Sequence, residues 1–139
     1  MKIRVLLVDD EKDFVETLAQ RLEARNLYVA AVSNGDEAVE RLKNEDFDVV
    51  VVDMLMPGKD GIETLRELKG VRPLVEVILL TGHATLESAI EGMRLGAFYY
   101  LMKPADIKSL LENIARAFQR KAEQEERIRQ AEIERLLRT

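Results

Sequence analysis

The sequence has no cysteine and no tryptophan, and its 139 residues include a single histidine, His83. Without cysteine, disulfide bonds, thiolate metal sites and thiol catalysis are excluded. One histidine cannot build a metal site of several histidines. No apolar run approaches the roughly 18 residues of a membrane-spanning helix, and the first apolar stretch is too short for a signal peptide. We therefore expect a soluble, cytoplasmic protein without membrane contact.

Basic residues are also scarce relative to acids. The chain has 21 lysines and arginines against 26 aspartates and glutamates, which gives a net charge of −5. Nucleic-acid binders normally carry a basic stripe, so direct nucleic-acid binding is not expected. A hydrophobic fraction of 47% is sufficient for a real core. The length fits one domain with, at most, a short appendage.

Short β-branched runs alternate with longer amphipathic stretches five times along the chain. Near-continuous apolar runs are typical of parallel strands covered on both faces, whereas apolar residues three to four positions apart predict helices. The pattern predicts an α/β fold in three layers, a parallel sheet between helices. The expected strands are 3–8, 28–32, 48–53, 76–81 and 99–102.

Polar side chains follow four of these five strands. In an open parallel sheet, sites form beyond the carboxyl ends of the strands, so we expect these side chains to converge there. The stretch "VLLVDDE" even ends on three consecutive acids. The residues are Asp9, Asp10, Asp53, Thr81 and Lys103.

The acids need a positive charge beside them. Two carboxylates about 4 Å apart repel by roughly 4 kcal/mol at an effective dielectric near 20. Mg²⁺ prefers oxygen ligands and commonly uses one or two protein carboxylates, and Mn²⁺ accepts the same ligands. Asp10 and Asp53 as ligands, with Asp9 close by, meet that demand. An alternative is that Asp9 or Asp10 caps the next helix, but this leaves Asp53 and Thr81 unexplained.

A carboxylate in a metal site can act as a nucleophile toward a phosphoryl group. Asp53 suits this role best, because it ends the most apolar strand and precedes the turn "MLMPGKDG". Phosphoryl transfer is catalysed mainly by positioning and charge neutralisation. Lys103 and Thr81 offer an ammonium and a hydroxyl for two of the phosphoryl oxygens, and the metal would take the third.

Four stretches, "LLVDDE", "VVVDMLMPGKDG", "ILLTGHA" and "GAFYYLMKP", resemble the signatures of bacterial two-component response-regulator receiver domains, in that family's order. The resemblance covers residues 1–118 and implies a doubly wound, flavodoxin-like (βα)5 fold with strand order 2-1-3-4-5. It implies a phosphorylation-dependent signalling switch, not a conventional enzyme. The phosphoryl donor would be a phosphohistidine of a sensor histidine kinase or phosphotransfer protein.

The resemblance also assigns roles to the acidic site. Asp53 would be the phospho-acceptor and a metal ligand, Asp10 a second ligand, and Asp9 a neighbour that is not a direct ligand and contacts the metal, if at all, through water. The backbone carbonyl of Leu55 would complete the protein's share of the Mg²⁺ shell.

On the other side of the site, the resemblance implies that Thr81 and Lys103 hold phosphoryl oxygens and that the Lys103–Pro104 bond is cis. Thr81 and Tyr100 would turn inward on activation and change the partner surface. Tyr99 stands where the family often has Asp or Gly, which places a second tyrosine beside that surface.

The chain from Gln119 onward is highly charged, and no glycine or proline follows Asp106. We expect a receiver domain over 1–118 and a charged helical extension or linker over 119–139. "TGHATLESAIEGMRLGA" resembles receivers attached to AAA+ transcription activators, in which such a helix pairs across a dimer. A homodimer through this helix is expected, and a solvated charged helix is the alternative.

Four other functions share features with a receiver. A haloacid-dehalogenase-type phosphatase needs a second aspartate where Leu55 stands. An FMN carrier needs a phosphate-binding turn after the first strand, where "VDDEKD" would repel the phosphate. A nucleotide hydrolase is disfavoured because no Walker sequence is present. The remaining alternative is a receiver-like docking module that is never phosphorylated.

Overall fold

The computed structural model describes residues 2–82 and 86–138, so His83 lies outside the described residues. Strands and helices alternate along the chain, as predicted. The sheet is parallel with the order β2-β1-β3-β4-β5, which confirms the predicted doubly wound topology. The strands are β1 Arg4–Val8, β2 Tyr28–Val32, β3 Val49–Asp53, β4 Glu76–Thr81 and β5 Tyr99–Met102. The helices are α1 Lys12–Glu23, α2 Gly35–Asn44, α3 Gly61–Val71, α4 Leu86–Arg94 and α5 Ile107–Leu137.

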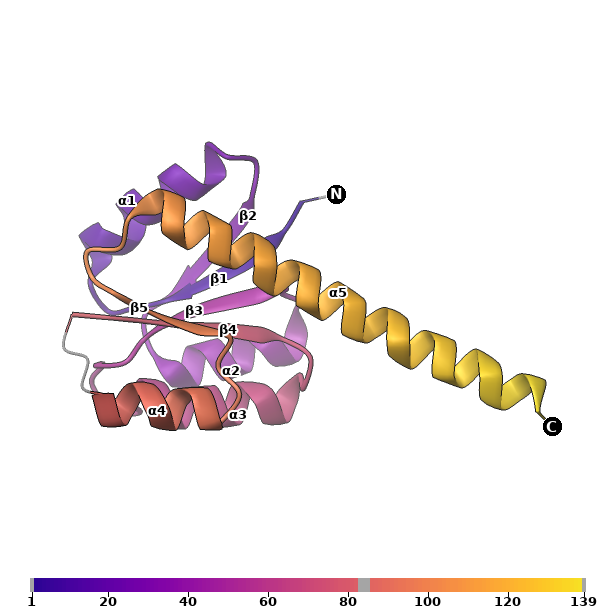
Figure 1. Cartoon of the computed structure of the whole chain (residues 1–139). Coiled ribbons are helices and arrows are strands. Elements are labelled where there is room, and N and C mark those ends of the chain that lie inside the picture. The colour runs from indigo at the N-terminus through magenta and orange to yellow at the C-terminus, as the bar shows by residue number, and fades with distance from the viewer. Residues whose placement is uncertain (1, 83–85, 139) are drawn as a thin grey trace.

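The helices cover both faces of the sheet, with α1 and α5 on one face and α2, α3 and α4 on the other (Figure 1). Successive residues of a strand point to opposite faces. Val50 and Val52 of β3 therefore pack in the core beneath α2 and α3. Val49 and Val51 pack in the second core, beneath α1 and α5. Every residue of β3 is buried, and this strand carries Asp53 at its end.

Helix α5 is 31 residues long, and only its first half packs on the domain. Leu110, Ile114 and Ala117 are fully buried, whereas the second half projects into solvent (Figure 1). At about 1.5 Å per residue the helix is roughly 46 Å long. None of the helices in the described part of the chain combines the length and apolar character of a membrane span.

Two ion pairs fasten α5 to the sheet where the helix leaves it. Arg120 binds the buried carboxylate of Glu76 at the start of β4 through two of its nitrogens, one at 2.7 Å, and lies 4.7 Å from the ring centre of Phe98. Lys121 lies 3.3 Å from the carboxylate of Asp48, just before β3. These contacts occur at the amino ends of the strands, opposite the predicted site.

Gly61 starts α3 directly behind the end of β3. A Cβ atom at this position would lie 2.6 Å from Met54 Cα and 2.9 Å from the Asp53 carbonyl oxygen, and both are backbone atoms. The Gly61 N–H donates to the Met54 carbonyl at 3.1 Å. The absence of a side chain therefore lets α3 begin against the backbone that presents Asp53.

We predict that Gly61→Ala destabilises the fold by about 1–3 kcal/mol, the usual effect of overpacking. Gly70 lies in the same helix, is exposed, and a Cβ atom there would meet nothing within 4 Å. Gly70→Ala should therefore be neutral or stabilising by about 0.4–1 kcal/mol. Urea unfolding followed by circular dichroism compares the two variants. Equal stability of both would contradict the close approach at Gly61.

Candidate functional site

The ends of β1, β3, β4 and β5 bring together the side chains that the sequence predicts to converge. Asp9, Asp53 and Thr81 are buried, with exposed fractions of 6%, 5% and 0%. Asp10 is exposed. The register of the sheet pairs Val8 with Val52, so Asp9 follows β1 directly beside Asp53.

Three of the acids form a compact group. Asp9, Asp10 and Asp53 each offer a carboxylate oxygen, and these oxygens lie within 4.8 Å of one another. Three hard oxygen donors, two of them buried, match the ligand preference of Mg²⁺ or Mn²⁺. The donor set therefore fits the divalent cation expected from the sequence. The ligand role of the Leu55 carbonyl remains a prediction.

Lys103 is the ammonium group of the site, and it contacts several acids at once. Its Nζ atom lies 2.7 Å from Asp9, 2.9 Å from Glu11 and 3.6 Å from Asp53. The Lys103 N–H donates to the Thr81 carbonyl at 2.7 Å, and the Lys103–Pro104 bond is cis, as expected. The side chain of Lys103 is only 12% exposed, so these charges face one another with little intervening water.

The electrostatics of the site oppose ionisation of Asp53. Burial raises the pKa of Asp53, and the neighbouring Asp9 raises it further. The Leu55 N–H, 3.3 Å from Asp53 Oδ1, and Lys103 act in the other direction without cancelling the effect. Burial lowers the pKa of Lys103, but hydrogen bonds to Asp9 and Glu11 outweigh burial and leave that pKa raised.

Glu11 and Phe14 also contact the site, although the sequence does not predict a role for either residue. Glu11 binds Lys103, and the Lys103 ammonium lies 4.4 Å from the centre of the Phe14 ring. Glu11 occupies the N-cap position of α1 without a side-chain cap, while its N–H donates to Asp9 Oδ1 at 2.9 Å. Neither Asp9 nor Asp10 is therefore the N-cap residue of this helix.

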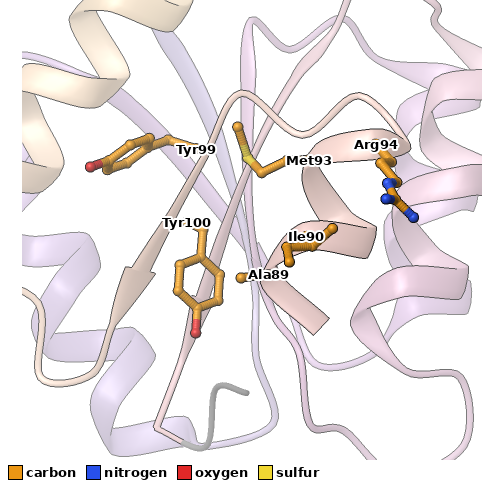
Figure 2. Close-up of a pocket in the computed structure, with 6 residues that line it drawn as sticks. All are labelled: Ala89, Ile90, Met93, Arg94, Tyr99 and Tyr100. Carbon is orange, nitrogen blue, oxygen red and sulfur yellow. The ribbon is translucent and has the colours of Figure 1, made fainter. Parts of the chain in front are cut away.

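A hollow of about 510 Å³ lies between α4 and β5. Figure 2 shows the Tyr100 ring beside Ala89 and Ile90 of α4. Tyr100 is half-buried, and its hydroxyl lies 3.7 Å from Met102 Sδ. The hollow is bordered by apolar side chains that are more than 40% exposed, namely Ile90, Met93 and Tyr99.

The fold and the site agree with a match between residues 5–115 and the family described as the response regulator receiver domain. The chain belongs to this family. Among curated proteins, the receiver is 34% identical to the transcriptional regulatory protein ZraR of Escherichia coli (strain K12) over 115 residues. That match covers 83% of this chain and 26% of ZraR, so the receiver spans about a quarter of its curated relative.

Solved structures of other receivers share the fold closely. The CheY-like receiver domain protein from Methanospirillum hungatei JF-1 is 29% identical with a TM-score of 0.85, over 89% of this chain and 99% of that one. A response regulator protein from Burkholderia pseudomallei, solved with a phosphorylated aspartic acid, calcium ion and citrate, is 31% identical with a TM-score of 0.78. That match covers 88% of this chain and 73% of the Burkholderia chain.

We predict that Asp53→Asn stabilises the receiver at pH 7 in metal-free buffer, by about 1 kcal/mol, because it removes a buried like charge. The folded-state pKa of Asp53 is raised, so the stability linked to its proton is complete below the unfolded-state pKa of about 4 and is lost as pH rises through the folded-state pKa. The gain from Asp53→Asn should therefore shrink toward pH 3.5. Urea unfolding at several pH values measures this gain in stability.

Asp10→Asn, at the exposed acid, is the control and should give a smaller gain. Destabilisation by Asp53→Asn at pH 7 would contradict the prediction.

Proposed function

We propose that this receiver accepts a phosphoryl group onto Asp53 from the phosphohistidine of a sensor histidine kinase or a phosphotransfer protein. One observation carries the proposal. Asp53 ends the fully buried strand β3 between two further carboxylates and an ammonium group, with Lys103 Nζ 3.6 Å away. In the transfer, a carboxylate oxygen of Asp53 forms a bond to phosphorus while the bond from phosphorus to the donor's histidine nitrogen breaks. The product is an acyl phosphate, and the histidine nitrogen keeps the electron pair.

Asp10 and Asp53 would hold Mg²⁺, or Mn²⁺, together with the Leu55 carbonyl, with Asp9 beside these ligands or in contact with the metal through water. When bound, the cation offsets the charge of the carboxylates and of the incoming phosphoryl group. The Burkholderia pseudomallei structure, solved with a phosphorylated aspartic acid and a calcium ion, supports a role for a divalent cation. The acids of this chain supply the oxygen donors that such an ion requires.

Lys103 and Thr81 would bind oxygens of the phosphoryl group. Both lie at the carboxyl edge, and the backbone bond between Lys103 N–H and the Thr81 carbonyl ties them together. A shift of Thr81 toward the phosphoryl group would be followed by Tyr100, which lines the hollow between α4 and β5 (Figure 2). Added charge at Asp53 would thereby change the surface that a partner meets.

The downstream output would be regulation of transcription. This part of the proposal is supported by the similarity to ZraR, a transcriptional regulatory protein. We place the switch in the cytoplasm, and we assign no direct nucleic-acid contact to this chain because of its net charge of −5. The receiver itself would catalyse only its own phosphorylation and dephosphorylation.

Residues 119–139 would form a linker that pairs two receivers through α5, with residues 1–118 as the receiver domain. The projecting half of the helix exposes Ile128, Ile133 and Leu137 to 48%, 39% and 80%. Pairing with a second copy would remove this apolar surface from water. The phosphorylated and free forms would differ in how tightly the two helices associate.

The alternative is a docking module that keeps the site and is never phosphorylated. We predict instead a single phosphoryl adduct on incubation with acetyl phosphate and Mg²⁺, seen by intact mass. The adduct should be absent without Mg²⁺ and absent in Asp53→Asn, because the acceptor oxygen is lost. Asp13→Asn, at an exposed acid of α1, is the control and should accept the group normally. A folded protein that binds Mg²⁺ but takes no phosphoryl group would favour the docking module.

We further predict that Ile133→Ser combined with Leu137→Ser raises the dissociation constant of the dimer about tenfold or more, since two apolar side chains leave the pairing surface. Glu134→Ser combined with Arg138→Ser is a matched control. These residues have the same spacing, form an exposed ion pair at 3.4 Å, and keep the net charge when both are replaced. Light scattering gives the association state with and without beryllium fluoride. A monomeric natural chain under both conditions would support the solvated helix.

A further inference from the structure

The ammonium group of Lys103 is shared unequally among three carboxylates. Asp9 and Glu11 lie 2.7 Å and 2.9 Å from Nζ, whereas Asp53 lies 3.6 Å away. The first two distances are those of charge-assisted hydrogen bonds, and the third is longer than such a bond. The acceptor is therefore the weakest partner of the group that would neutralise its phosphoryl charge.

Glu11 differs from the other two acids in its surroundings. The side chains of Asp9 and Asp53 are each 5% exposed, and both belong to the acid group that would hold the metal. The Glu11 side chain is 62% exposed, and it is not a member of that group. It sits at the first position before α1, and the bond from its N–H to Asp9 Oδ1 fixes its backbone.

The contact between Glu11 and Lys103 holds the ammonium in a defined place. Phe14, one turn into α1, lies below the same ammonium with its ring centre 4.4 Å away. Lys103 is thus held most closely by Asp9, Glu11 and the Phe14 ring, with Asp53 as its more distant partner. A phosphoryl oxygen on Asp53 would compete with these groups for the ammonium.

We infer that Glu11 is a positioning residue that retains Lys103 in the unphosphorylated receiver and competes with the phosphoryl group for it. This inference rests on the proposed phosphorylation of Asp53. Because Glu11 is mostly exposed, its ion pair is weak and is readily exchanged for the stronger pair with a phosphoryl oxygen. Phosphorylation is slower because the Lys103 ammonium is not available to the phosphoryl group while Glu11 holds it.

The test compares two substitutions at Glu11 with one at Glu16. Glu11→Gln keeps the size of the side chain and removes its charge, whereas Glu11→Asp keeps the charge and withdraws the carboxylate by one methylene. Both weaken the contact with Lys103. Glu16 is exposed on α1 and forms no ion pair or side-chain hydrogen bond with the described residues, so Glu16→Gln removes a nearby charge alone.

Rates of adduct formation are measured by intact mass at saturating Mg²⁺ over a range of acetyl phosphate concentrations. Both Glu11 variants should raise the limiting rate by about two- to fivefold, the factor that corresponds to an exposed ion pair. Glu16→Gln should leave the limiting rate unchanged and alter, at most, the half-saturating concentration of the anionic donor. The inference is overturned if Glu11→Asp leaves the limiting rate unchanged and Glu11→Gln gives the same limiting rate as Glu16→Gln. Overall charge would then explain the data.

Exchange of the Lys103 amine protons in ¹⁵N-lysine-labelled protein gives a readout that a general effect on folding would not produce. Exchange at Lys103 should be faster in both Glu11 variants than in the natural chain and in Glu16→Gln. Unchanged exchange overturns the inference. A chain that takes no phosphoryl group overturns the proposed function and this inference with it. A chain that is phosphorylated at a rate independent of Glu11 overturns this inference alone.

Discussion

A single buried ammonium group faces three carboxylates at the carboxyl edge of the sheet, and the rest of the site depends on that imbalance. Lys103 contacts Asp9 and Glu11 closely and Asp53 at 3.6 Å, so negative charge remains in excess beside it. Burial strengthens repulsion and attraction alike, because little water screens the charges. Any added cation is therefore favoured here, and the energy of the site changes when a charged group is attached to Asp53.

The fold maintains this arrangement by means of apolar residues that carry no chemistry. Four consecutive valines of β3 pack between the two helical layers and hold Asp53 at the end of the strand. Gly61 allows α3 to start against the same backbone. Asp53 thus carries a desolvation cost that the packing of its own strand offsets. In this receiver, apolar residues within the strands form the scaffold, and polar residues at the strand ends form the site.

The alternating apolar runs were sufficient to predict a parallel sheet between helices and nearly all of the strand boundaries, whereas the strand order followed from the resemblance to receiver domains. β1 and β3 each begin one residue later than expected, since Asp48 uses its side chain to accept the Arg4 N–H at 2.9 Å and to contact Lys121. The convergence of strand-end side chains followed from parallel topology alone. The contact of Glu11 with Lys103 did not, because these residues are 92 positions apart and the sequence does not specify where an N-cap side chain points.

The ion pairs of Arg120 and Lys121 fix the point from which the free half of α5 projects. They fasten α5 at the amino edge of the sheet, and the 17 residues that follow Lys121, up to Arg138, extend about 26 Å beyond that anchor. On an arm of that length, each degree of tilt at the anchor moves the far end by roughly 0.4 Å. A tilt of about five degrees at the two ion pairs would thus move the distal end of the helix by roughly 2 Å.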